Sequence, residues 1–196
     1  DFSNEAVLKT AQVLEELVTK GYIDPRAAGY VYPQGQSNIA DGSVAMYLNG
    51  SWLPNEVKNM AGDDFQWGCF SYPAVEGGTD GTEAANYGGQ VLAINKNSQH
   101  AEDAFKLITY ITKGEFDKKL SEESLGIPSD TTNSEWPVQL TDVKPVMESL
   151  KTRYPWAAGA EDNVDMTPII KENMTKLCSG AITADEFVSN LQAAGK

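Results

Sequence analysis

Four aromatic side chains stand beside expected chain reversals rather than inside apolar runs. With their polar and glycine neighbours they form three groups: Trp52 with Asn49 and Ser51, Tyr87 with Gly88 and Gly89, and Arg153 with Tyr154 and Trp156. A flat ring can stack on the apolar C–H face of a sugar, whose hydroxyls need polar partners such as amides, carboxylates, guanidinium groups or backbone N–H groups. Concave sites combine such walls with a few polar groups. These residues therefore suit a polyol-binding surface, although each ring could also simply close an edge of the core.

Residues for acid–base, nucleophilic or metal chemistry are scarce. The chain has one histidine, His100, so a zinc site of the two- or three-histidine type cannot form within it. The sequence contains no G-x-S-x-G elbow, no P-loop and no G-x-G-x-x-G fingerprint. Adjacent acids such as Asp63-Asp64 and Glu161-Asp162 could serve a glycosidase, but loop acids of this kind are typical of a solvated surface. We therefore expect no catalytic residue, no metal ligand and no cofactor.

The amino-acid composition and net charge limit the kinds of molecule that this chain is expected to bind. The 196 residues are 41% hydrophobic and 22% charged, which is typical of a globular chain. Twenty-eight acidic and 15 basic residues give a net charge of −13. Such a surface repels phosphate backbones, so nucleic acid is not an expected partner. It also argues against a bulky anionic ligand unless a local basic pocket exists.

The spacing of apolar residues, together with capping and turn residues, predicts the helices and strands that position these side chains. Apolar residues at three- and four-residue steps and capping signals predict six helices, near 4–20, 54–60, 98–112, 142–150, 167–178 and 184–193, with further helical turns at 115–122. Short apolar runs predict strands at 45–48, 65–72 and 91–94, and the segment 30–37 is expected to be a loop. Helices alternating with strands predict an α/β layered domain.

Six segments, taken in order, resemble a known family. They are 41–52 (of the form G-x-x-A-M-x-x-x-G-x-W), the strand 65–73 that ends in proline, the glycine-rich 87–98, the helix 101–112, Gly126-Ile127-Pro128-Ser129, and the closing 179–187. Each motif alone is weak, but together they resemble family 1 extracellular solute-binding proteins, the family that includes maltose-binding protein. The chain is similar to the C-terminal half of such a protein.

That resemblance implies a fold, a site and partners. The fold would be periplasmic-binding-protein-like type II, mainly the second lobe with a short first-lobe excursion: residues 1–92 and 129–196 in the second lobe and 93–128 in the crossing and first-lobe segment. Trp52 matches the family's ligand-stacking aromatic, and residues 87–89 match the loop lining the cleft. The implied function is capture of a sugar or oligosaccharide between two lobes and its delivery to the membrane permease subunits of an ABC importer. The signal peptide and lipid anchor of a cell-surface lipoprotein, or the leader of a periplasmic protein, would lie upstream.

Three alternatives stay open at this stage. The same fold could bind a non-sugar solute such as a polyamine or a peptide, because an acidic cleft can hold a cation. A glycosidase would need two carboxylates at a defined separation. An isolated fragment could also pair with a second copy, because the apolar face carrying Phe105, Ile108 and Ile111 would otherwise be exposed.

Overall fold

The computed structural model describes residues 2–155 and 163–195 and divides the chain into two compact units. The first unit comprises residues 1–35, 71–88 and 150–196, and the second comprises 36–70 and 89–149. Eight α-helices and two short strands form within the described residues. None of those helices combines the length and the apolar character needed to cross a bilayer.

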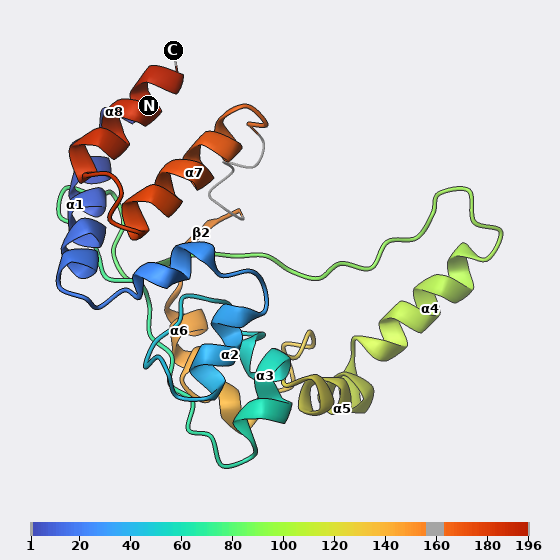
Figure 1. The fold of residues 1–196 in the computed structure, drawn as a ribbon. Coiled ribbons are helices and arrows are strands. Elements are labelled where there is room, and N and C mark those ends of the chain that lie inside the picture. The colour runs from blue at the N-terminus through green and yellow to red at the C-terminus, as the bar shows by residue number, and fades with distance from the viewer. Residues whose placement is uncertain (1, 156–162, 196) are drawn as a thin grey trace. The chain divides into compact units, whose positions relative to one another are not determined.

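Three helices pack side by side in the first unit: α1 (Glu5–Thr19), α7 (Met166–Cys178) and α8 (Ala184–Ala194) (Figure 1). Their shared core consists of Ala11, Leu177, Ala184, Phe187 and Leu191. Local signals set their ends. The side chain of Asn4 caps α1, Thr183 and Glu186 form a capping box on α8, and Gly180 adopts φ +73° just after α7.

Two short parallel strands complete the first unit. Strand β1 (Ala84–Asn86) pairs with β2 (Thr152–Tyr154), with Ala85 opposite Arg153 and Asn86 opposite Tyr154. A 3-10 turn, Pro25–Gly29, follows α1. The strand pair is the regular sheet of the described residues, and it brings together two segments far apart in sequence.

The second unit is helical and only lightly packed. Its small core joins Ala40, Leu53 and Val57, with Trp67 against it. Its helices are α3 (Leu53–Ala61), α4 (Ala101–Ile111), α5 (Gly114–Ser124) and α6 (Val143–Ser149), with a 3-10 turn at Val138–Leu140. Helix α2 (Gln34–Ala40) lies where the first unit passes into the second.

Helix α4 is amphipathic, yet it buries none of its residues. It contacts α5, and the side chains of Phe105, Leu107 and Tyr110 are 64%, 61% and 64% exposed. A helix of this kind in a folded protein normally lays its apolar stripe against a partner. Within the second unit that stripe has little to cover it.

The expected helices are confirmed, whereas the expected strands are wrong. Segments 45–48, 65–72 and 91–94 are extended or irregular, without ladder pairing. The physical reason is that a strand exists through hydrogen bonds to a neighbouring strand, and these segments find none within the described residues. The segment 30–37 was expected to be a loop, but its second half starts α2, where Gln36 and Ala40 are buried. The α/β class is thus borne out only as helices with a small sheet.

Candidate functional site

The turn before α3 positions Trp52. The Asn49 side chain accepts a hydrogen bond from the Gly50 N–H at 2.7 Å, and the Gly50 carbonyl accepts from the Leu53 N–H at 3.1 Å. Trp52 is the residue before the first turn of α3, and its carbonyl accepts from the backbone of Asn55 at 3.1 Å. Its side chain is 44% exposed, so part of the ring is open to solvent. Ser51, also an expected site residue, is half-buried in the same turn.

The strand pair β1–β2 brings Tyr87 next to Arg153 and Tyr154. The Tyr87 N–H donates to the Tyr154 carbonyl at 2.8 Å and so extends the ladder by one residue. The guanidinium carbon of Arg153 lies 5.2 Å from the centre of the Tyr87 ring, within cation–π distance. Tyr87 remains 47% exposed. The strand pair therefore brings together residues that are more than 60 positions apart in sequence. We call Tyr87, Arg153 and Tyr154, with the Tyr154 partner Asp80, the strand-pair cluster.

Alternation along the strands gives the cluster two faces. Arg153 shares a face with Ala85, its register partner, and with Tyr87, whereas Tyr154 points to the opposite face. On that side the Tyr154 hydroxyl donates to the Asp80 carboxylate, and this bond, more than burial, raises the pKa of Tyr154. Sequence reasoning missed Asp80, since the partners are separated by 74 positions and no local motif links them.

The remaining expected residues are less constrained. Gly88 and Gly89 are exposed, and a Cβ at either position would meet no atom within 4 Å. No neighbouring atom therefore requires glycine at either position. Trp156 lies outside the described residues. Trp52, Asn49, Ser51 and Gly89 belong to the second unit, while Tyr87, Gly88, Arg153 and Tyr154 belong to the first.

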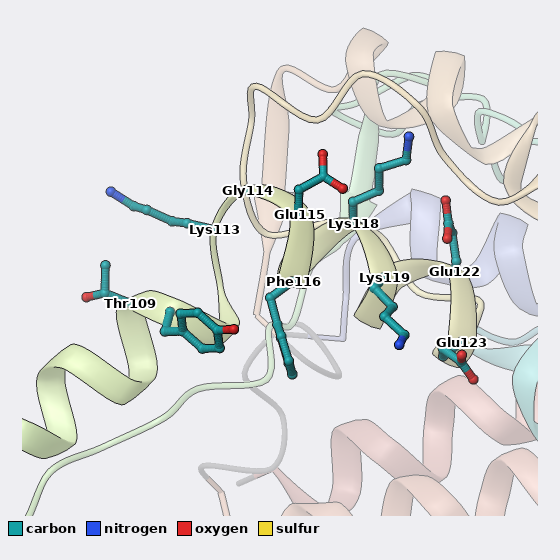
Figure 2. A pocket seen from close by; sticks show the side chains of 10 residues that line it. Thr109, Lys113, Gly114, Glu115, Phe116, Lys118, Lys119, Glu122 and Glu123 are labelled. Atoms are coloured by element: carbon teal, nitrogen blue, oxygen red, sulfur yellow. The ribbon is translucent and has the colours of Figure 1, made fainter.

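Described residues of the second unit line a larger and a smaller hollow, and neither of these two is lined by an expected site residue. The larger, about 680 Å³, lies between α4 and α5 and is shown in Figure 2. In this hollow the ring centres of Tyr110 and Phe116 lie 5.1 Å apart. In Figure 2, Glu115 and Lys118 point to the side of α5 opposite Phe116. Its three lysines are matched by three glutamates, so it has no strong charge preference.

The smaller hollow, about 190 Å³, lies beside the end of α3. Trp67 forms one wall, and its ring is tilted by 45° against that of Phe65 with 4.6 Å between ring centres. Lys58, Asp63 and Glu123 contribute charges. Lys58 already donates to the Glu123 carbonyl at 3.4 Å. No cluster of three or more histidine, cysteine or acidic side chains suited to a metal occurs in residues 2–155 and 163–195.

Comparison with known sequences decides the family. The model of the family described as bacterial extracellular solute-binding protein matches residues 3–115, more than half of the chain. The chain belongs to this family of bacterial extracellular solute-binding proteins. The family resemblance inferred from the motifs is thereby confirmed, and the matched range includes both the Trp52 turn and Tyr87.

Individual relatives are distant. Binding proteins from Brucella abortus (strain 2308), Brucella abortus biovar 1 (strain 9-941) and Brucella suis biovar 1 (strain 1330) are each 21% identical over 126 residues. The match covers 64% of this chain and 30% of each relative. The chain thus spans only part of the length of the curated relatives it matches. Members of this family are binding proteins rather than enzymes, and they act outside the cytoplasm.

Proposed function

We propose that this chain contributes the ligand-contacting surface of a solute-binding protein that captures a sugar or oligosaccharide and delivers it to the permease of an ABC importer. The observation that carries the sugar assignment is that each unit holds a partly exposed aromatic ring beside polar groups: Trp52 in the second unit is 44% exposed, and Tyr87 in the first is 47% exposed. Partly exposed aromatic rings beside polar groups suit the apolar and hydroxyl faces of a sugar. Family membership supports capture without turnover.

The proposal includes a two-lobed arrangement. Residues 1–92 and 129–196 would belong to one lobe and 93–128 to a crossing into the other, with ligand held between lobes and closing them. The apolar stripe on α4, whose large side chains are exposed, supports the idea that 93–128 packs against another part of the complete gene product. The same proposal places that product at the cell surface through a lipid anchor, or in the periplasm.

The decisive experiment is a ligand panel. Bound solute raises the melting temperature, by more when its concentration exceeds Kd by a larger factor. A thermal-shift screen of the complete gene product with neutral saccharides, uronates, polyamines and short peptides at equal concentrations therefore identifies the class. We expect a saccharide to bind with Kd of about 1 μM or tighter, and calorimetry to show no product formation. Stabilisation by polyamines or peptides alone would overturn the sugar assignment and leave the family intact.

A matched variant then tests the site. Trp52→Ala is expected to weaken saccharide binding by about 2 kcal/mol, because buried aromatic anchors account for much of a binding free energy. Trp136→Ala is the control, since that ring lies 5.8 Å from the Lys144 ammonium group and outside the proposed site. Equal losses for the two variants would remove Trp52 from the site.

A further inference from the structure

The chain has two arginines, and they are held in different ways. Arg26 is paired with its neighbour Asp24, with a nitrogen–oxygen distance of 2.8 Å. Arg153 instead lies over the exposed ring of Tyr87, and no carboxylate stands within 4.0 Å of it among residues 2–155 and 163–195. The chain has 28 acidic and 15 basic residues, so most basic groups are expected to find a carboxylate. Arg153 has none among the described residues.

The cation–π contact with Tyr87 restricts where the guanidinium group can lie. A planar cation over a ring loses part of its rotational freedom before a ligand arrives, and its N–H donors remain available at its edges. Those donors match the two oxygens of a carboxylate in a bidentate pair. The backbone fixes the arrangement, because the Tyr87 N–H bond to the Tyr154 carbonyl and the register of Ala85 with Arg153 hold both residues on one face.

The neighbouring ring specifies the rest of the ligand. Tyr87 is 47% exposed, so its uncovered surface can receive an apolar C–H face next to the guanidinium group. We infer that the captured solute is a carboxylate-bearing saccharide, such as a uronic acid or an oligouronate, with its carboxylate on Arg153 and its ring against Tyr87. This inference rests on the proposed function and names the class of sugar.

The net charge of −13 does not exclude such a ligand. Exposed charges are screened beyond about 8 Å at physiological ionic strength, so the contact with Arg153 outweighs the distant acids. The nearest acid of the cluster, Asp80, lies with Tyr154 on the opposite face of the strand pair and is engaged by the Tyr154 hydroxyl.

Calorimetry on the complete gene product, with paired ligands that differ only at the carboxylate, tests the inference. We expect glucuronate or galacturonate, or their oligomers, to bind at least about tenfold more tightly than the corresponding neutral sugars, because charge-assisted bidentate bonds are roughly twice as strong as neutral ones. Arg153→Gln should remove that preference, so that acidic and neutral sugars bind the variant with equal affinity. Arg153→Lys should restore only part of it, since the ammonium group lacks the planar fork. Arg26→Gln is the control and should keep the full preference.

The possible results distinguish failure of the acidic-sugar inference from failure of the proposed sugar capture. Equal affinity for neutral and acidic sugars, or a preference that survives Arg153→Gln in a protein with unchanged melting temperature, overturns the inference and leaves sugar capture standing. Binding of simple dicarboxylates such as glutarate without any saccharide overturns both.

Discussion

The indole ring of Trp52 lies directly over Gly50: a Cβ placed on residue 50 would stand 2.1 Å from the ring carbon Cζ3. Such a distance cannot be accommodated, so the ring position observed here requires glycine at that position. Gly50 does not have a positive φ, which means that the space occupied by the ring, and not the backbone conformation, sets the requirement.

Gly50→Ala should therefore displace the Trp52 ring. Because the ring is 44% exposed and can swing outward, the free energy of unfolding should fall by about 1 kcal/mol or less, below the usual cost of overpacking a closed core. The Trp52 indole N–H resonance should shift, and saccharide affinity should fall as it does in Trp52→Ala. Gly29→Ala is the matched control, because a Cβ there meets open space and the residue lies outside the proposed site. An unchanged indole resonance in Gly50→Ala would show that the Trp52 ring does not occupy the space over residue 50.

The capping box of α8 should be worth a measurable amount of stability. The Glu186 N–H donates to the Thr183 hydroxyl at 3.2 Å, and the Thr183 N–H donates to the Glu186 carboxylate at 2.9 Å. Thr183→Ala should lower the free energy of unfolding by about 1 kcal/mol in urea titration. Thr175→Ala, which removes an exposed hydroxyl bonded only to the preceding turn of α7, should stay within about 0.5 kcal/mol of the parent. Similar values for the two variants would contradict this assignment.

The start of α8 and the C-terminal ends of α1 and α7 were predictable because their signals are local. Thr183 with Glu186, and the glycines at 21 and 180, act within a few residues of their own position, and each has the role expected of it. Helix α2 was missed because Gly35, Ser37 and Asn38 are poor helix formers. Burial of Gln36 and Ala40 accompanies the helix instead.

The strand-pair cluster could not be predicted from the sequence. Residues 84–86 are Ala-Ala-Asn, which carry no β-branched or aromatic signal, yet they pair with residues 152–154. The Arg153–Tyr87 contact depends on that register, since a slip of one residue would turn Arg153 to the other face. Sequence reasoning selected both residues individually, but neither their contact nor the role of Asp80 follows from local pattern.

A buried carboxylate ties α5 to the segment after it. Asp117 is 2% exposed and accepts hydrogen bonds from the Ser129 N–H at 2.9 Å, the Asp130 N–H at 3.1 Å and the Asn133 side chain at 2.8 Å. Asp117→Ala leaves these donors without an acceptor and should lower the free energy of unfolding by about 3 kcal/mol. Asp103→Ala, on the exposed surface of α4, should change it by less than about 0.5 kcal/mol. Chemical denaturation of both variants is the measurement, and a small loss for Asp117→Ala would mean that solvent replaces the carboxylate.

Acid should weaken the same region through Asp130. Its pKa is lowered from 3.8 to about 2, first by the Gly114 N–H and then by the Thr132 hydroxyl and N–H. A carboxyl group whose pKa is depressed by folding stabilises the folded state above its unfolded pKa, and that contribution is lost as pH falls through the folded pKa. The urea midpoint should therefore drop between pH values of about 4 and about 2, and Asp130→Asn should show a shallower drop. A parallel pH profile for the variant would assign the acid sensitivity elsewhere, for example to Asp24, whose pKa is lowered by Arg26.

The uncovered stripe on α4 should make the chain of residues 1–196 associate. Phe105, Leu107 and Tyr110 each expose a large apolar side chain on this helix, and exposed apolar surface favours contact between copies. Light scattering coupled to size exclusion should show a mass that rises with concentration, and Phe105→Lys should hold the chain closer to its monomer mass of 21.2 kDa. Val13→Lys, which changes a 45% exposed residue on α1, is the control and should leave association unchanged. If the complete gene product covers this stripe, it should remain monomeric without any substitution, whereas association of both forms to the same extent would place the contact outside α4.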